Sequence, residues 1–163
     1  MQIIKTKCPA KINLYLKVGN LRKDGLHNIR SRFQLVDLYD DLIIKKTNCD
    51  FLIKSNLNKK KFLQNNILNL AHYHLTQETG DKLRCEVSLK KNIPIGAGLG
   101  GGSSNVASFL VATNKLFKLG LSIRKLNKIA AKIGADIPFF MHGNNAYVYG
   151  FGNQLAISMN YNH

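Results

Sequence analysis

Polar and apolar residues alternate along the first part of the chain, most clearly in PAKINLYLKV. Residues 2–20 and 29–46 keep this two-residue period, and residues 51–55 repeat it briefly. Successive side chains of a strand point to opposite faces, so the pattern predicts two long strands and a short one, with Lys11 and Asn13 on the same face. The segment LRKDGLHN predicts the turn that joins the two long strands.

Helical spacing of apolar residues dominates the middle of the chain. One helix is predicted from about Asn66, and another between Ser122 as N-cap and Gly134 as terminator. The apolar faces expected for these two helices are Ile67, Leu70, Ala71 and Leu75, and Ile123, Leu126, Ile129, Ala130 and Ile133. The later segments DIPFFM and NAYVYG predict two short strands separated by HGNN. Early strands followed by helices predict an α+β fold, with a sheet and helices in two layers.

The length and composition of the chain limit the number of domains and the kinds of partner to be expected. A chain of 163 residues with 45% hydrophobic content can bury a core, and one domain is expected. Its 24 Lys and Arg against 9 Asp and Glu give a formal charge of +15, which would attract polyanions. The lysines are scattered, however, and a coding bias toward Lys and Asn explains them equally well.

The cysteines favour a reducing compartment. Cys8, Cys49 and Cys85 are odd in number and lack C-x-x-C spacing, which indicates neither a disulfide framework nor a zinc site. The N-terminal segment lacks a continuous apolar stretch, and no run of about 18 apolar residues occurs. The sequence therefore predicts a cytoplasmic protein without a membrane span.

A glycine-rich segment, IPIGAGLGGGSSN, occupies residues 93–105 and has five glycines within seven positions. It follows a strand-like run, CEVSLKKNIPI, and precedes a helix-like run for which Ser103 or Ser104 is the expected N-cap and Gly120 lies just past the end. A glycine-rich turn that opens a helix presents free backbone N–H groups and the positive end of the helix dipole, which suits a phosphate. The segment therefore predicts a phosphate-binding loop.

Two common phosphate loops do not fit this segment. Three of its glycines match G-x-G-x-x-G, but a dinucleotide site also needs an acidic residue about 20 positions later. No acidic residue occurs between Glu86 and Asp136. A Walker A loop needs Lys before the hydroxyl residue, where this chain has Gly102 before Ser103.

Few residues can act as a base. Asp136 precedes the apolar IPFF, so its carboxylate is expected at the edge of the core, as a base or as a structural hydrogen-bond acceptor. Lys11 and Asn13 would face water unless their side of the strand meets the glycine loop. His27 is the one histidine in a turn near that strand, and the sequence has no nucleophile-elbow arrangement of Ser, His and Asp.

Three ordered segments from about Cys8 to about Gly152 resemble the GHMP kinases: PAKINLYLKV with RKDGLH and FQLVDLYD, then IPIGAGLGGGSSN, then GADIPFF. The resemblance implies the α+β N-terminal domain of that family, similar to domain 2 of ribosomal protein S5, over residues 1–152. Residues 153–163 then form an atypical tail in place of the family's second domain. Leu26 and Asn153 depart from the family pattern, which has Tyr and an acidic residue there.

The resemblance also implies a catalytic site. Asp136 would be the general base and Lys11 would stabilise charge. Asn13 and His27 would bind the cytidyl substrate, and Ser103 or Ser104 would lie near Mg²⁺. The residues implied for ATP are Pro94, Ile95, Gly96, Ala97, Gly98, Leu99, Gly100, Gly101, Gly102, Ser103, Ser104 and Asn66.

The activity implied is ATP-dependent phosphorylation of the 2-hydroxyl of a cytidine diphosphate methylerythritol, in non-mevalonate isoprenoid precursor biosynthesis. ATP, Mg²⁺ and this small molecule would be the ligands, and a homodimer is left open. Two alternatives remain: an RNA-binding module like ribosomal protein S5, and a truncated, inactive kinase domain. Nucleic acid is disfavoured because no Lys or Arg cluster is interleaved with aromatic residues.

Overall fold

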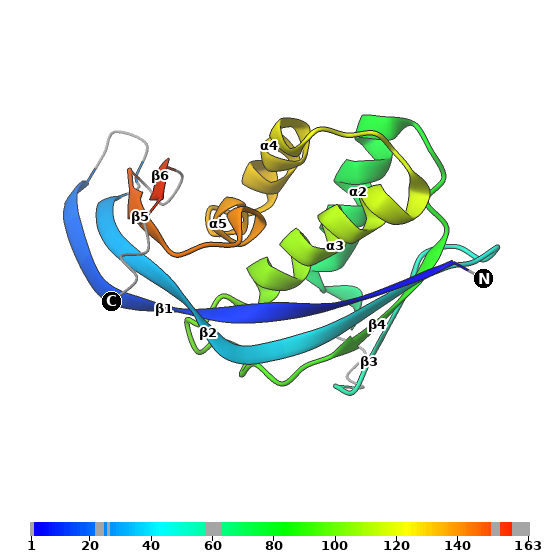
Figure 1. Cartoon of the computed structure of the whole chain (residues 1–163), viewed down its shortest axis with the longest axis horizontal. Helices are drawn as coiled ribbons and strands as arrows, with labels where there is room; N and C mark the ends of the chain where they lie inside the picture. The colour runs from blue at the N-terminus through cyan, green and yellow to red at the C-terminus, as the bar shows by residue number, and fades with distance from the viewer. Residues whose placement is uncertain (1, 22–24, 26, 58–62, 151–153, 158–163) are drawn as a thin grey trace.

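A long antiparallel hairpin forms the base of the molecule (Figure 1). The computed structural model describes residues 2–21, 25, 27–57, 63–150 and 154–157. Within them, β1 (Ile3–Leu21) pairs with β2 (His27–Lys46), as the alternating pattern predicts. The predicted turn between them falls largely outside the described residues, as do Leu26, Asn153 and most of the tail.

The hairpin belongs to a mixed sheet. The sheet order is β3-β4-β2-β5-β6, and β1 pairs with the free side of β2. The remaining strands are β3 (Leu52–Ser55), β4 (Cys85–Lys90), β5 (Ala146–Tyr149) and β6 (Gln154–Ile157). Only β3 and β4 are parallel among the described pairs. The predicted strands at 51–55 and in NAYVYG are thereby confirmed.

Helices cover one face of the sheet (Figure 1). They are α2 (Ile67–Thr79), α3 (Gly101–Phe117), α4 (Ile123–Ile133) and α5 (Ile137–His142). Leu42 and Ile44 of β2 and Val87 of β4 are fully buried beneath them, because alternate strand residues face this layer. The expected two-layer α+β fold is confirmed. None of the described helices is long and apolar enough to cross a membrane.

The predicted start of α2 and the predicted caps of α4 are confirmed. Asn66 precedes α2 and its side chain accepts a hydrogen bond from Leu68 N at 3.1 Å. Ser122 precedes α4 and accepts from Lys125 N at 3.3 Å, and Gly134 ends that helix. The buried faces are partly wrong: α2 buries Leu68, together with Ala71 and Leu75, in place of Leu70, which is 42% exposed.

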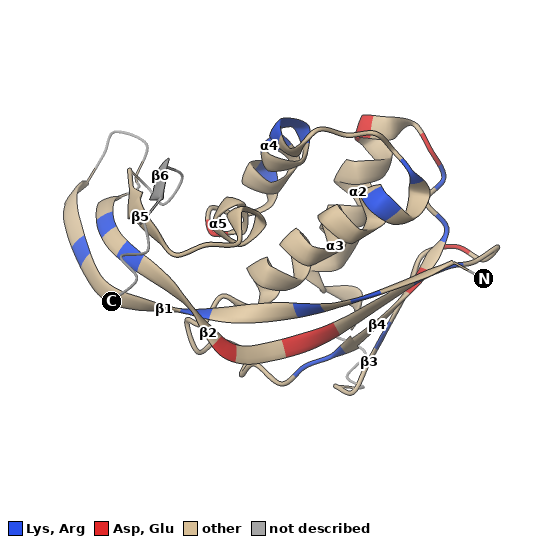
Figure 2. Ribbon diagram, in the orientation of Figure 1, with Lys and Arg blue, Asp and Glu red and all other residues tan. Residues whose placement is uncertain are grey.

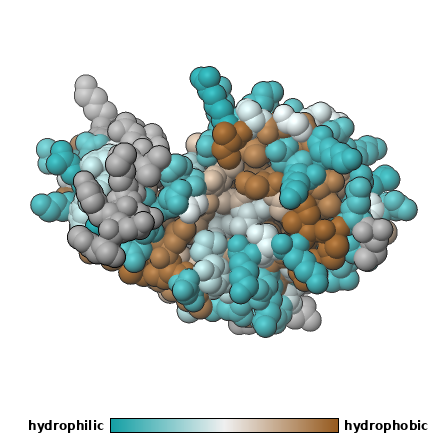
Figure 3. All heavy atoms as spheres, in the orientation of Figure 1, coloured by the Kyte–Doolittle hydropathy of each residue, from teal (hydrophilic) through white to brown (hydrophobic). Residues whose placement is uncertain are grey.

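Ile123, the first residue of α4, is also exposed, contrary to the expected apolar face. Figure 3 shows how apolar surface gathers over the helices and along the hairpin. Leu16 and Val18 are among the exposed apolar residues of β1.

The expected start of α3 is wrong. The helix begins at Gly101 with Gly100 at the N-cap position, so Ser103 and Ser104 lie inside the first turn. Gly100 has φ of 70°, a left-handed conformation that ends the loop without a capping side chain. At the other end the helix is capped by Lys118, and Gly120 lies farther along the connection.

The segment DIPFFM is also not a strand. Its residues form α5, with Asp136 at the N-cap position and Pro138 in the first turn, where a missing N–H costs no hydrogen bond. Phe139 and Phe140 are adjacent in the sequence and both are buried. A short helix packed in the core can bury two adjacent side chains, whereas a strand with one exposed face buries only every second residue. A six-residue apolar run cannot distinguish these cases by itself.

Candidate active site

The Lys11 face of β1 meets the glycine loop. Lys11 N donates to Leu99 O at 2.9 Å, which ties the strand to the loop through the backbone. The pairing of β1 with β2 shifts between Pro9 and Ala10, just before this contact. Lys11 Nζ donates to Asn13 Oδ1 at 2.6 Å, so the two side chains share a face as predicted.

Lys11 is buried, and neighbouring side chains hold its ammonium group in place. The residue is 5% exposed and its Nζ lies 4.3 Å from the centre of the Phe33 ring, in a cation–π contact. Asp136 Oδ2 lies 3.6 Å from Nζ. The two charges come from opposite ends of the sequence, and the fold brings them together beside the loop.

The carboxylate of Asp136 is partly exposed and does not cap its own helix. It occupies the N-cap position of α5, but within the described residues its side chain makes no capping hydrogen bond. Its side chain is 34% exposed. The carboxylate therefore faces Lys11 and solvent instead of serving the helix, and it can accept a proton from a hydroxyl placed there.

Close approach explains two of the glycines. A Cβ on Gly100 would lie 2.6 and 2.8 Å from Phe140 ring carbons and 3.2 Å from Lys11 Cγ. A Cβ on Gly101 would lie 2.9 Å from Ile93 and 3.0 Å from Lys91 Nζ. The loop is thus packed directly against Lys11 and Phe140 on one side and against Lys91 and Ile93 on the other.

A cavity of about 460 Å³ opens at the start of α3. The residues lining it are Asn65, Asn66, Ile67, Lys91, Pro94, Ile95, Gly96, Gly100, Gly101, Gly102, Ser103 and Asn105. Eight of the residues implied for ATP are among them, whereas Ala97, Gly98, Leu99 and Ser104 are not. No side chain among the described residues caps α3, which leaves its first N–H groups for an anion.

Lys91 was not anticipated from the sequence. It lines the cavity, and its side chain is 5% exposed. Its ammonium group pairs with the fully buried Asp40 and donates to Asn105 Oδ1 at 3.3 Å. Its position next to Lys90, between a predicted strand and Pro94, was the one indication of a role at the loop. This pair did not stand out, because lysines are scattered along the whole sequence.

The first turn of α3 supplies oxygen atoms suited to Mg²⁺. Ser103 lines the cavity, and Ser104 Oγ is buried without a hydrogen-bond partner among the described residues. No group of three His, Cys, Asp or Glu in the described part of the chain could hold a metal ion. These residues fit a magnesium that is held mainly by nucleotide phosphates and water, with one protein oxygen.

His27 lies apart from this cluster. It pairs with Leu21 at the far end of the hairpin, whereas Lys11 pairs with Leu35. Eight residues of strand separate them, roughly 25 Å along β2. The His27 ring contacts Gly19 O through Nδ1 at 2.9 Å, so the structure does not bring it to Lys11.

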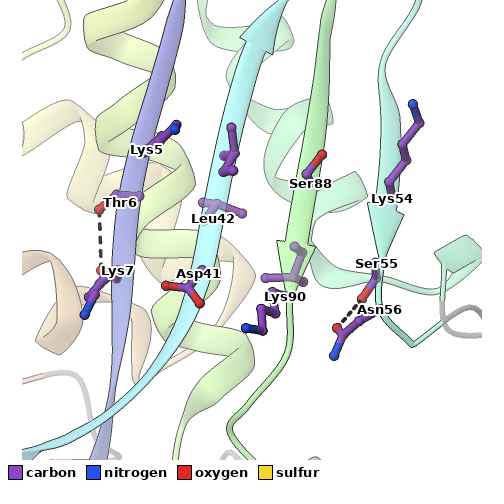
Figure 4. A pocket seen from close by; sticks show the side chains of 12 residues that line it. Lys5, Thr6, Lys7, Asp41, Leu42, Lys54, Ser55, Asn56, Ser88 and Lys90 are labelled. Carbon is purple, nitrogen blue, oxygen red and sulfur yellow. Dashed lines mark hydrogen bonds between the residues drawn. The ribbon is translucent and has the colours of Figure 1, made fainter.

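A larger cavity, of about 740 Å³, lies on the open face of the sheet (Figure 4). It is lined from β1, β2, β4 and the end of β3, and it includes Lys5, Lys54 and Lys90. Figure 2 shows that Lys and Arg also recur along the hairpin. Neither the glycine loop nor the Lys11–Asp136 pair lines this cavity, so it is not the site of the predicted chemistry.

Comparisons with known proteins agree with this geometry. Residues 65–144 match the model for the GHMP kinases N terminal domain. The chain is 40% identical over 148 residues to the 4-diphosphocytidyl-2-C-methyl-D-erythritol kinase of Ruthia magnifica subsp. Calyptogena magnifica, covering 91% of this chain and 52% of the relative. The enzyme of the same name from Shewanella baltica (strain OS185) is 42% identical, covering 90% of this chain and 52% of the relative.

A solved structure supports the same relationship. The crystal structure of 4-(cytidine 5'-diphospho)-2C-methyl-D-erythritol kinase superposes with a TM-score of 0.83 at 31% identity, covering 95% of this chain and 55% of that one. The chain thus spans about half the length of the relatives it matches. These relatives are kinases, which supports the kinase interpretation and not the RNA-binding alternative. The chain is therefore similar to the GHMP kinases, and residues 65–144 match the N-terminal domain of that family.

Proposed function

We propose that this chain is the ATP-binding part of a kinase that phosphorylates the 2-hydroxyl of 4-diphosphocytidyl-2-C-methyl-D-erythritol. The observation that carries the proposal is the 3.6 Å approach of Lys11 Nζ to Asp136 Oδ2, directly beside the glycine loop. The substrate is inferred from the names of the relatives. Free cysteines in the described structure fit our placement of the protein in the reducing cytoplasm.

The nucleotide would lie in the cavity at the start of α3. Backbone N–H groups of the loop and the helix would receive the phosphate oxygens, because an uncapped helix start favours anions. Asn66, at the rim, is the residue expected near the adenine. Mg²⁺ bound to ATP supplies charge neutralisation at the phosphates, with Ser103 or Ser104 as its protein ligand.

Asp136 would remove the proton from the substrate hydroxyl. Lys11 would stabilise the negative charge that develops on the reacting oxygens, since its ammonium group is held in place by Asn13 and the Phe33 ring. Asn13 accepts that hydrogen bond through its oxygen, which leaves its Nδ2 donors for the substrate. Positioning and charge, without covalent chemistry by the protein, are typical of phosphoryl transfer.

The test is phosphoryl transfer by the purified chain. ADP release is followed after mixing with Mg²⁺-ATP and the diphosphocytidyl alcohol, alone and with the second half of the Ruthia relative added as a separate polypeptide. Asp136→Asn should lower turnover by roughly 10² to 10⁴, the contribution of a general base. Asp37→Asn, an exposed carboxylate on β2, is the matched control and should retain activity.

If the Asp136→Asn variant turns over substrate as fast as the wild-type chain, Asp136 is rejected as the base. Failure to bind Mg²⁺-ATP at all would reject the proposed nucleotide site. Binding without turnover under either condition would reject the proposed substrate.

A further inference from the structure

Asp40 is a fully buried carboxylate at the back of the nucleotide cavity. Its Oδ1 accepts from the backbone N–H groups of Asn92 at 2.8 Å and Ile93 at 2.9 Å. Its Oδ2 accepts from Asn105 Nδ2 at 2.9 Å and from Lys91 Nζ. Four donors therefore satisfy this one carboxylate.

These contacts join three segments that are separate in the sequence: strand β2, residues 91–93 at the entry of the glycine loop, and the first turns of α3. A buried carboxylate is costly unless it is paired and hydrogen-bonded, and a buried ion pair is often no more stabilising than apolar residues of similar volume. Stability alone is therefore a weak reason for this network. Lys91 and Asn105 both line the cavity, and residues 91–93 lead directly into Pro94, which also lines it.

The ammonium group of Lys91 has a donor to spare. It carries three N–H groups, and within the described part of the chain Asp40 Oδ2 and Asn105 Oδ1 take two of them. Nζ also lies 3.0 Å from the point where a Cβ on Gly101 would stand, so it is pressed against the first residue of α3. The third donor is left for a ligand oxygen at the helix start.

We propose that Asp40 is a positioning residue for the triphosphate. It holds the Lys91 ammonium group and the backbone of residues 91–93 in the arrangement that receives the phosphate oxygens, without touching the nucleotide itself. This inference rests on the proposed ATP site. It predicts that Asp40 matters for the phosphates and not for the nucleoside.

The experiment measures the affinity of the full chain for Mg²⁺-ATP and for adenosine by titration calorimetry. Asp40→Asn keeps the size of the side chain but removes its charge, and places an amide against the Asn105 amide. We expect Mg²⁺-ATP affinity to fall about ten-fold, the effect of losing one charge-assisted hydrogen bond, with adenosine affinity unchanged. Asp37→Asn, the exposed carboxylate on the same strand, should change neither affinity.

Asn105→Ala is the second variant, for use if Asp40→Asn does not fold. It removes the carboxamide that joins Asp40 to Lys91, and should likewise weaken Mg²⁺-ATP and spare adenosine. Equal losses for both ligands would show a merely structural role and overturn the proposal, as would unchanged Mg²⁺-ATP affinity in the variants. A wild-type chain that binds no Mg²⁺-ATP would overturn the proposed function together with this inference, whereas the other two outcomes overturn the inference alone.

Discussion

Gly100 is the residue on which the geometry of the site depends most closely. It ends the loop in a left-handed conformation and lies against the Phe140 ring and the Lys11 stem. Lys11 in turn contacts Asp136, so a displacement at this glycine would move one member of the proposed catalytic pair directly. The absence of a side chain at this position serves the packing of the protein itself as well as the approach of a ligand.

Gly100→Ala should therefore weaken both the fold and nucleotide binding. The matched control is Gly98→Ala, because Gly98 has a similar φ of 73° but no described atom within 4 Å of an added Cβ. Gly98→Ala should cost about 1–2 kcal/mol of unfolding free energy from backbone strain alone. Gly100→Ala should cost clearly more, as measured by urea denaturation, and an equal cost for both would contradict the close packing.

The three cysteines differ sharply in environment. Burial raises the pKa of the Cys85 thiol to about 12, and it also raises the pKa of Cys8. Cys49 is exposed. Because the thiolate is the reactive form, the two buried thiols should be inert at neutral pH.

Labelling with iodoacetamide at about pH 8, near the usual thiol pKa, checks this difference. Mass spectrometry should find Cys49 modified in the native chain, and all three cysteines modified after denaturation. Rapid modification of Cys8 in the native chain would show that the core beside Asn105 opens readily.

At the scale of single elements, α2 and α4 begin in the same way but differ in their surroundings. Asn66 and Ser122 each accept a hydrogen bond from the first turn of their helix. Asn66 also lines the nucleotide cavity, whereas Ser122 lies outside it. The capping residue therefore serves stability in α4, whereas in α2 it serves stability and also lines the proposed nucleotide site.

Ser122→Ala and Asn66→Ala should each lower the unfolding free energy by about 1 kcal/mol, the usual value of an N-cap. Only Asn66→Ala should also weaken Mg²⁺-ATP binding, because it removes a side chain from the cavity rim. Denaturant titration and calorimetry on the two variants separate these effects. Loss of nucleotide affinity in Ser122→Ala would mean that fraying of α4 reaches the site.

The local sequence pattern predicted most elements, because apolar residues recur with one period in strands and another in helices. The alternation of β1 and β2 and the caps of α4 could be read directly, and the structure confirms them. Residues 137–142 could not be assigned, because a short apolar run fits a strand or a buried helix equally well. The start of α3 was misplaced because Gly100 ends the loop by its backbone conformation, a role usually given to Ser or Thr side chains.

For the molecule as a whole, the sheet separates two environments. The helical side holds the core, the Lys11–Asp136 pair and the proposed nucleotide cavity. The open side carries lysines around a cavity without catalytic groups (Figure 4). The strong positive charge is therefore divided between the two sides, and only the buried lysines belong to the proposed site.

Global stability should depend on pH through His72. Its ring stacks on Phe51 at 4.0 Å and contacts Leu83 O through Nε2 at 2.9 Å, and burial lowers its pKa below 6.5. The neutral ring is thus favoured in the folded state. Its contribution is complete above pH 6.5 and is lost as pH falls through the lowered pKa.

His72→Gln should therefore flatten the fall in unfolding free energy between about pH 7.5 and about pH 5, the range in which histidine titrates. Denaturant titrations at several pH values give the comparison. An unchanged slope in His72→Gln would place the pH dependence elsewhere.

The sequence by itself determined the order and type of most elements, the place of the glycine-rich loop and the resemblance to a family, because local periodicity and contiguous motifs specify these features. It could suggest Asp136 and Lys11 but not their 3.6 Å approach, and it gave no indication that Asp40 and Lys91 meet behind the loop. Such contacts join residues far apart in the chain, and no local pattern specifies them. They arise only when β2, the loop and α3 pack around one core and leave these charges together at its edge.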